Sequence, residues 1–275
     1  METQMDAIQP LVERVTFRDS DHTYKLDGKK IPSVTTLLGN LSKPALPWWA
    51  AKMGAEAVRD RILDLDLAVV EDWKPGDQAA FADEAYHLAQ RAHMRKATDA
   101  AAKGSIVHNA IEQFHTNFFD AEAPADDPRA LAAWDAFIAW WALAGLTCVS
   151  TERIIVDPDG RYSGRLDMLC EDSSSLWYVC DIKTSNGIYP EMILQNAGYA
   201  AALEAETGRE VAGTKVLWLP EGAEKLTVVE RDRDEWKLDY TIFEALIPIH
   251  AHRKALDKWL REVKSTHGPK QETPA

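Results

Sequence analysis

Three apolar segments, separated only by short turns, lie between residues 148 and 183 and limit the folds open to this chain. They read CVSTERIIVD, YSGRLDMLCED and SLWYVCDIK, with Pro158-Asp159-Gly160 and Asp172-Ser173-Ser174 in the turns. Short apolar runs bounded by turn residues are typical of consecutive β-strands. The last run stays apolar at successive positions until its end, so we expect a central strand that is covered on both faces.

Helical periodicity surrounds these strands. The sequence predicts helices from about Gln78 to Ala102, over 131–145, over 190–207 and over 234–264, with further strands at 213–220 and 225–231. Gly104 is expected to end one helix and allow the next, SIVHNAIEQFHTNF, to begin. This order predicts an α/β fold with a mixed central β-sheet flanked by helices, plus a helical N-terminal elaboration.

We expect one domain with three regions. Residues 1–102 form N-terminal strands and a helical cap within the same domain, and residues 103–265 form the core with its C-terminal helix. Residues 266–275, which end in the segment HGPKQETPA, are expected to be a disordered tail.

Composition narrows the class of protein. Hydrophobic residues make up 46% and charged residues 27% of the 275-residue chain, as in a globular protein with a substantial core. No apolar run approaches the ~20 residues of a membrane helix, and METQMDAIQP does not resemble a secretory signal, so we expect a cytoplasmic protein without membrane contact. The net charge of −13 argues against a broad nucleic-acid-binding surface, so any DNA contact would be local or assisted by a metal or partner.

The end of the third predicted strand carries an acid and an amine on one face. Side chains alternate along a strand with a period of two, so Asp181 and Lys183 point the same way. Asp167 lies 14 residues earlier, across one turn, where an antiparallel pairing would bring it near Asp181. Two carboxylates and the backbone carbonyl of Ile182 would suit Mg²⁺ or Mn²⁺, with Lys183 placed to orient water or stabilise a phosphate. A structural ion pair, with Asp167 capping a turn, is the alternative.

Two helical segments carry further polar pairs. His108 and Glu112 are four residues apart, and so are Gln195 and Tyr199, which places each pair on one helix face. An imidazole can complete an oxygen-rich metal site, whereas an amide and a phenol can contact nucleic acid. Each pair has an ordinary alternative: a hydrogen-bonded or solvated His–Glu pair, and a core tyrosine beside a surface glutamine.

Taken in order, the segments GSIVHNAIE, SGRLD, DIKTS and QNAGY resemble the motifs of the PD-(D/E)XK nuclease superfamily, in its RecB-type and phage exonuclease branch. The resemblance spans about Lys103 to Tyr199 and implies a restriction-endonuclease-like core. It also implies Mg²⁺- or Mn²⁺-dependent hydrolysis of DNA phosphodiesters, by an exonuclease that acts in phage or bacterial recombination or repair.

The resemblance also implies roles for individual residues. The metal positions match His108, Asp167, Asp181 and the carbonyl of Ile182, which would hold one or two ions. Lys183 takes the catalytic lysine position, Asp181 and Asp167 act with it, and Glu112 matches the helix acid. The positions that would contact substrate match Gln195 and Tyr199. Glu152, on the preceding strand, is a further and weaker candidate.

Other residues next to these motifs are candidates on their chemistry alone. Thr184 and Ser185 have hydroxyls that could donate to a phosphate, or simply cap the following helix. Lys103 belongs to a basic cluster that could touch phosphates, although a solvated helix face is the alternative.

The predicted substrate is linear duplex or single-stranded DNA, in a bacterial or phage-infected cytoplasm. A single-strand annealing protein or other recombination partner and an oligomeric state are compatible with the resemblance. Cys148, Cys170 and Cys180 do not match the iron–sulfur staple of many relatives, and no phosphate-binding GxxxxGK[ST] loop is present, so we expect neither a cluster nor a nucleotide cofactor. A non-catalytic DNA-end-binding or assembly subunit, and an enzyme acting on RNA or a small phosphoester, are the alternative functions.

Overall fold

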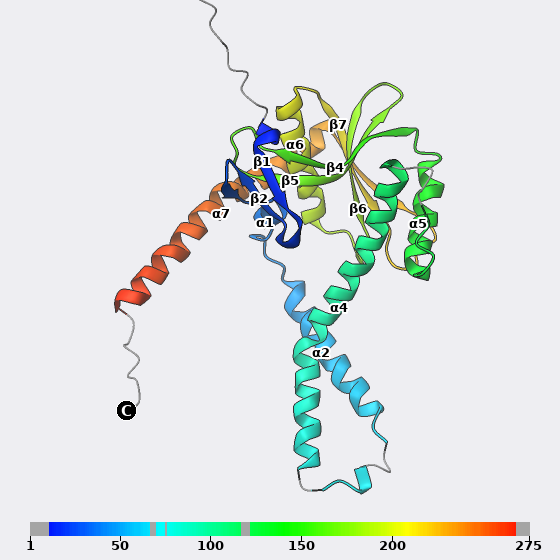
Figure 1. Ribbon diagram of the computed structural model, residues 1–275, viewed down its shortest axis with the longest axis vertical. Helices are drawn as coiled ribbons and strands as arrows, with labels where there is room; N and C mark the ends of the chain where they lie inside the picture. The colour runs from blue at the N-terminus through cyan, green and yellow to red at the C-terminus, as the bar shows by residue number, and fades with distance from the viewer. Residues whose placement is uncertain (1–10, 67–69, 75, 117–121, 268–275) are drawn as a thin grey trace, which may run out of the picture. The chain divides into compact units, whose positions relative to one another are not determined.

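A mixed five-stranded β-sheet is the larger of two sheets in the computed structural model, which describes residues 11–66, 70–74, 76–116 and 122–267 and their side chains up to residue 264 (Figure 1). The sheet order is β4-β5-β6-β7-β8, with β6 and β7 parallel and the other neighbours antiparallel. The strands are β4 (Leu146–Val156), β5 (Ser163–Asp172), β6 (Trp177–Lys183), β7 (Val211–Trp218) and β8 (Thr227–Asp232). The three strands expected between residues 148 and 183 are therefore confirmed as β4, β5 and β6.

Helix α6 (Pro190–Thr207) makes the crossover that the parallel pair β6–β7 requires, and its bounds match the predicted helix over 190–207. It packs across β4, β5, β6 and β7. Tyr162 donates a hydrogen bond from its hydroxyl to the Gly198 carbonyl at 2.9 Å, which ties the helix to the segment before β5. Gly198 also lets α7 (Arg233–His267) approach, because a Cβ at this position would lie 2.9 Å from the Phe243 ring. Helix α5 (Pro128–Trp141) precedes the sheet, with the Asp127 carboxylate accepting from the first backbone N–H groups.

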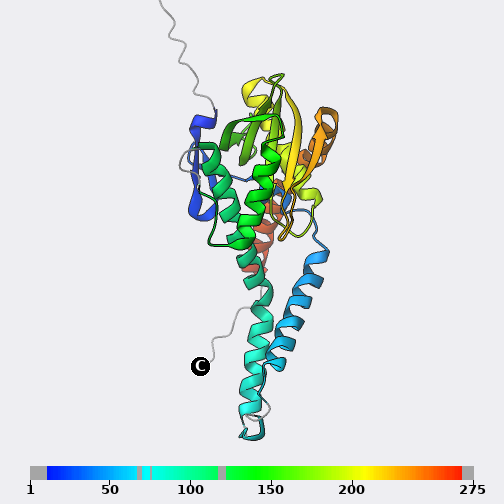
Figure 2. The same cartoon turned by 90° about the vertical axis from the view of Figure 1, so that its right-hand side faces the viewer.

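The N-terminal segment adds a small antiparallel sheet of β1 (Val15–Arg18), β2 (Thr23–Leu26) and β3 (Lys29–Ile31), with short 3₁₀ turns at Leu11–Arg14 and Asp19–Asp21. Figure 2 shows these strands, in dark blue, beside the green strands and away from the orange β8. Helix α1 (Val34–Leu38) follows, and the Ser33 hydroxyl accepts from Thr36 N at 3.0 Å, so Ser33 is the N-cap of this helix. Ser163 N donates to Pro32 O at 3.1 Å and joins this segment to the start of β5.

The chain divides into two compact units, and the elements above belong to the first, Met1–Asn40 with His108–Ala275. The second unit, Leu41–Val107, contains α2 (Ala45–Leu63) and most of α4 (Asp77–Thr116). Arg61 pairs with Glu84 at 2.9 Å, and the Trp49 and His93 rings lie 6.5 Å apart. The later residue of α2, Arg61, contacts the earlier residue of α4, Glu84, so these two helices are antiparallel.

The predicted break at Gly104 is wrong, because α4 continues through it as one 40-residue helix. A glycine inside a helix costs only about 1 kcal/mol relative to alanine, and the alanine-rich sequence before it supports the helix. The fold-class prediction is confirmed as an α/β fold with a mixed sheet flanked by helices, an arrangement consistent with a restriction-endonuclease-like core. The predicted regions 1–102 and 103–265 stay a prediction, and residues 268–275 of the predicted tail lie outside the described residues. Among the described helices, none is both long and apolar enough to cross a membrane.

Candidate metal centre

The antiparallel pair β5–β6 brings two of the predicted acids together. Met168 pairs with Cys180 in the sheet, so Asp167 and Asp181 are the next residues toward the end of the ladder. Asp167 Oδ2 accepts a hydrogen bond of 2.8 Å from the backbone N–H of Ile182, the residue after Asp181. This bond fixes the Asp167 carboxylate against the end of β6.

A second group forms around Asp167. His108 of α4, Glu152 of β4 and Asp167 of β5 each offer one ligand atom within 4.8 Å of the other two, and all three side chains are half-buried. His108 Nδ1 lies 3.5 Å from Asp167 Oδ2. Metal ions are commonly held by three or more His, Cys, Asp or Glu side chains. Among the described residues, these three have the spacing of such ligands. The candidate that the sequence ranked lowest, Glu152, therefore lies inside the group, and Asp181 lies next to it.

Glu152 reaches this position through an unusual backbone conformation. Its φ of 49° lies in the left-handed region, which few residues other than glycine adopt, within an otherwise extended strand. Such a residue costs of order 1–3 kcal/mol and commonly marks a functional position. Burial raises the pKa of Glu152, Arg165 lowers it, and the carboxylates of Asp167 and Glu112 raise it further. A cation between these acids would relieve that repulsion.

Arg165 is a member of the site that the sequence analysis missed. Its Nε lies 2.5 Å from Glu152 Oε2, and its guanidinium also lies 4.9 Å from the centre of the Phe17 ring. Arg165 stands two residues before Asp167 on β5, so strand periodicity puts both on one face. That spacing within the SGRLD segment was the signal that could have found it.

Asp181 and Lys183 form a close ion pair on β6. Lys183 Nζ lies 2.6 Å from Asp181 Oδ2, and the Asp181 side chain has no exposed surface. Oδ2 is buried, and the Lys183 ammonium is the charged group in contact with it. Burial raises the pKa of Asp181 to about 6, with Lys183 opposing the rise and Asp167 adding to it. For Lys183, burial lowers the pKa, but the Asp181 and Asp167 carboxylates outweigh this and leave it raised.

The other oxygen of Asp181 is held from α6. Gln195 Nε2 donates to Asp181 Oδ1 at 3.2 Å and also lies 3.0 Å from the Tyr199 hydroxyl oxygen. Tyr199 is buried, and it packs where Gly164 leaves room, since a Cβ on Gly164 would lie 2.5 Å from Tyr199 Cε1. The structure therefore links both predicted α6 residues to Asp181, and their predicted contact with substrate stays a prediction.

The remaining predicted residues lie at several distances from this group. Glu112 is one turn after His108 on α4 and acts electrostatically on Glu152. Ser185 follows β6, and its hydroxyl donates to the Gly187 carbonyl at 2.8 Å, while Thr184 is the residue between it and Lys183. Lys103 lies on α4 within the second unit. The roles of these residues and of the Ile182 carbonyl stay predictions.

The donor set fits a divalent metal ion. Ligand atoms within 4.8 Å of one another can all lie about 2.0–2.5 Å from one ion, which is the bond length for nitrogen and oxygen ligands. Burial and the neighbouring Asp167 carboxylate raise the pKa of the Asp181 carboxyl, and a cation bound nearby would lower that pKa. Carboxylates with one imidazole suit Mn²⁺ or Mg²⁺ among the common ions.

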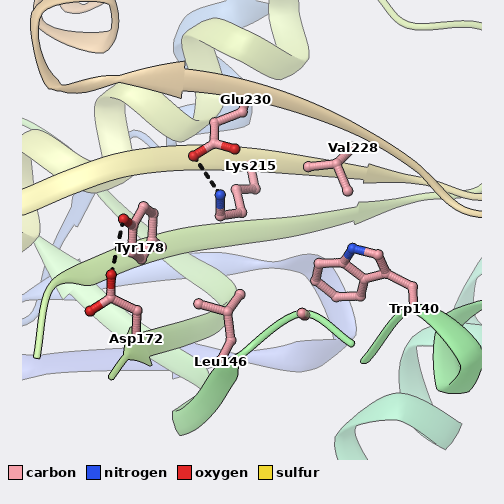
Figure 3. A pocket seen from close by; sticks show the side chains of 8 residues that line it. Trp140, Leu146, Asp172, Tyr178, Lys215, Val228 and Glu230 are labelled. Atoms are coloured by element: carbon pink, nitrogen blue, oxygen red, sulfur yellow. Dashed lines mark hydrogen bonds and ion pairs between the residues drawn. The ribbon is translucent and has the colours of Figure 1, made fainter. Parts of the chain in front are cut away.

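A separate hollow of about 280 Å³ lies beside the middle of the sheet, and Figure 3 shows the side chains that line it. Lys215 Nζ there lies 2.5 Å from Glu230 Oε1, and the Tyr178 hydroxyl donates to Asp172 Oδ2 at 3.3 Å. Polar groups of this hollow thus already interact with one another. The lining residues are Trp140, Ala144, Leu146, Asp172, Tyr178, Lys215, Val228 and Glu230.

Comparison of the sequence with protein-family profiles and with curated proteins finds no match. Among solved structures, the chain is similar to an alkaline exonuclease from Laribacter hongkongensis, with 16% identity, a TM-score of 0.31 and coverage of 46% of this chain and 70% of the other. The same exonuclease in complex with dAMP matches with 14% identity, a TM-score of 0.37 and coverage of 80% and 98%. A protein designated SSO0001 matches with 13% identity, a TM-score of 0.29 and coverage of 62% and 86%.

Proposed function

We propose that this protein is a nuclease that uses Mg²⁺ or Mn²⁺ to hydrolyse DNA phosphodiesters, and that it acts as an exonuclease. The observation that carries the proposal is the convergence of His108, Glu152 and Asp167, with the Asp181–Lys183 pair beside them. An imidazole, several carboxylates and a half-buried ammonium are side chains that can support metal-assisted phosphodiester hydrolysis. The four ordered sequence motifs support DNA as the substrate.

In this proposal, His108, Glu152, Asp167 and Asp181 hold the metal, with the Ile182 carbonyl and Glu112 as further candidates. A bound divalent ion would polarise the scissile phosphate and lower the pKa of a water molecule. Lys183 stays protonated because of its two carboxylate neighbours, so it offers positive charge and a hydrogen bond to a phosphate oxygen or to the attacking water. Gln195 keeps the Asp181 carboxylate in one orientation.

Arg165 has a role of its own in the proposed site. It neutralises one Glu152 oxygen, which leaves the other oxygen for the metal. The site holds more carboxylates than one metal ion needs. Arg165 offsets the charge of one of them and so reduces their mutual repulsion.

The chain's net charge of −13 bears on substrate binding. An acidic protein gains little from a general electrostatic attraction to DNA, so we propose that bound metal, Lys183 and the substrate-contact candidates Gln195, Tyr199, Thr184, Ser185 and Lys103 provide most of the attraction. Cytoplasmic location, action in recombination or repair, and a single-strand annealing partner belong to the same proposal.

The proposal is tested by incubating the purified chain with linear duplex, circular duplex and single-stranded DNA, and with RNA, in Mg²⁺, Mn²⁺ or EDTA. We expect digestion of linear but not circular DNA, only with a divalent ion, and loss of digestion in Asp167→Asn. Asp159→Asn, which changes an acid that is 74% exposed, is the matched control and should digest normally. If both variants and the wild type leave all four substrates intact with either ion, a non-catalytic DNA-end-binding role replaces the nuclease proposal. Preferential digestion of RNA would change the substrate class.

A further inference from the structure

The last half of α7 exposes several large apolar side chains. Figure 1 shows this half, in orange and red, extending away from the five-stranded sheet. Every residue from 251 to 262 is exposed, and these include Leu256, Trp259 and Leu260. Isolated helices of this length are marginal in water, because most helical stability in proteins comes from packing an apolar face. A helix with these exposed side chains is therefore expected to pack against something.

The apolar residues of α7 follow two separate faces. Trp236, Phe243 and Leu246 are buried and pack on the chain's own core. A second face is exposed from Leu238 to Trp259, and its positions are separated alternately by four and three residues. These eight positions, which we call the α7 seam, are Leu238, Ile242, Ala245, Ile249, His252, Leu256, Trp259 and Val263.

The spacing of the α7 seam is that of a coiled coil. Alternation of four and three gives a period of 3.5 residues, which keeps one stripe facing a second helix along its whole length. With Leu238 at position d, the a positions hold Ile242, Ile249, Leu256 and Val263. All four a positions are therefore apolar, as the buried seam of a coiled coil requires. The seam covers 26 residues, or ~39 Å of helix, and its apolar members Leu238, Ile242 and Trp259 are 66%, 52% and 57% exposed.

Charge selects the direction of a second helix. The C-terminal part of α7, residues 251–264, contains five Lys or Arg and two Asp or Glu, a net charge of +3. Residues 237–250, which would face them in the antiparallel pairing described below, contain one Lys and two Asp or Glu, a net charge of −1. A parallel pair of α7 helices would place +3 beside +3, whereas an antiparallel pair places each basic end beside an acidic segment of an acidic chain.

The seam is also complementary to itself in the antiparallel direction. A twofold axis between residues 250 and 251 pairs each a position with a d position of the other copy. Ile242 then faces Trp259, and the small Ala245 faces the larger Leu256. Such a contact is isologous, because the same surface serves both copies.

We infer that two copies of this chain associate through an antiparallel coiled coil formed by their α7 seams. The five Lys and Arg of residues 251–264 lie outside the seam, so the apolar stripe fits a helix better than it fits DNA. The inference is independent of the proposed nuclease activity, since no seam residue belongs to the metal centre.

The test is sedimentation or light scattering of the full-length chain across a hundredfold range of concentration. We expect a dimer for the wild type and a dissociation constant raised at least ~100-fold in Leu256→Glu. Arg261→Glu puts the same side chain on the same helix away from the seam, and it should stay dimeric. Far-ultraviolet circular dichroism and DNA digestion should be unchanged in both variants, which shows that the core still folds.

Disulfide trapping tests the direction. Leu238→Cys and Val263→Cys proteins should cross-link when mixed under oxidising conditions, whereas each alone should not, with the wild type as the background. Cross-linking of each variant with itself would overturn the antiparallel arrangement. The inference itself would be overturned by a monomeric wild type, including one that binds DNA through Arg253 and Lys254. It would also be overturned by a dimer that persists in Leu256→Glu.

Discussion

Lys183 Nζ lies 2.6 Å from Asp181 Oδ2, and that carboxylate is fully buried at the end of a central strand. A buried ion pair is weak support for stability, because desolvating both charges costs about as much as their attraction returns. A pair in this position is better explained by chemistry, since the ammonium can reach a substrate phosphate while Asp181 and Asp167 keep it protonated. The predictions below separate that role from a structural one.

Replacing Lys183 with methionine should abolish catalysis without abolishing binding. The variant keeps the length of the side chain but removes the charge, so we expect the rate of DNA cleavage to fall at least ~100-fold with little change in DNA affinity. Lys215→Met is the control, because Lys215 also ion-pairs with a carboxylate, Glu230 at 2.5 Å, but on β7 and away from the metal centre. Equal rates in the two variants would assign Lys183 a structural role only.

A Gln195→Leu variant tests whether Gln195 orients the Asp181 carboxylate or binds substrate. The Gln195 amide nitrogen lies within hydrogen-bond distance of Asp181 Oδ1 and the Tyr199 hydroxyl, so Gln195→Leu should disturb the orientation of the carboxylate. We expect kcat to fall ~10- to 100-fold while KM for DNA stays near the wild-type value. The steady-state kinetics of digestion measure both constants, and a variant that changes KM alone would show that Gln195 contacts DNA instead.

Gly164 should tolerate no side chain. A Cβ there would lie 2.5 Å from Tyr199 Cε1 and 3.2 Å from Val34 Cγ2, so Gly164→Ala must displace the Tyr199 ring or the strand. We expect a loss of about 1–3 kcal/mol in the free energy of unfolding, together with reduced activity. Gly187→Ala is the matched control, since its Cβ would meet Tyr189 at an ordinary 3.5 Å and should change stability by less than about 0.5 kcal/mol. Urea denaturation of both variants gives the comparison.

His115 should make the fold sensitive to acid. Its ring lies 4.4 Å from the centre of Trp141, its Nε2 is buried without a hydrogen-bond partner, and burial lowers its pKa from 6.5 to about 4. Between pH 6.5 and 4, His115 is therefore protonated in the unfolded chain but neutral in the folded chain. Its contribution to the free energy of unfolding is fully present above pH 6.5. It is lost as the pH falls toward 4, by up to ~1.4 kcal/mol per pH unit. His115→Phe should flatten this part of the curve in urea denaturation at several pH values. An unchanged slope would mean that other groups cause the acid sensitivity.

Much of this fold was readable from the sequence because its signals are local. The apolar runs and turn residues of β4, β5 and β6 predicted three strands, and the periodicity of residues 190–207 predicted α6 with its observed bounds. Gly104 misled the prediction because one glycine weakens a helix without ending it when its neighbours are strong helix formers.

The metal centre was only partly predictable, because its geometry depends on the tertiary structure. Asp167 and Asp181 could be brought together by strand pairing alone, and His108 by its position on a helix face. Glu152 joins them through a left-handed φ of 49°, which no pattern of alternation predicts. The pairing of Gln195 with Asp181 depends on how α6 packs across the sheet, and the sequence does not specify that packing.

The most direct test of the central claim, that a divalent ion binds where His108, Glu152 and Asp167 converge, is a calorimetric titration of the full-length protein with Mn²⁺. We predict saturable binding by the wild type and by Asp159→Asn, and an affinity weakened at least ~100-fold in Asp167→Asn. Equal Mn²⁺ affinity in all three proteins, or no binding by the wild type, would contradict the metal centre and the nuclease proposal with it.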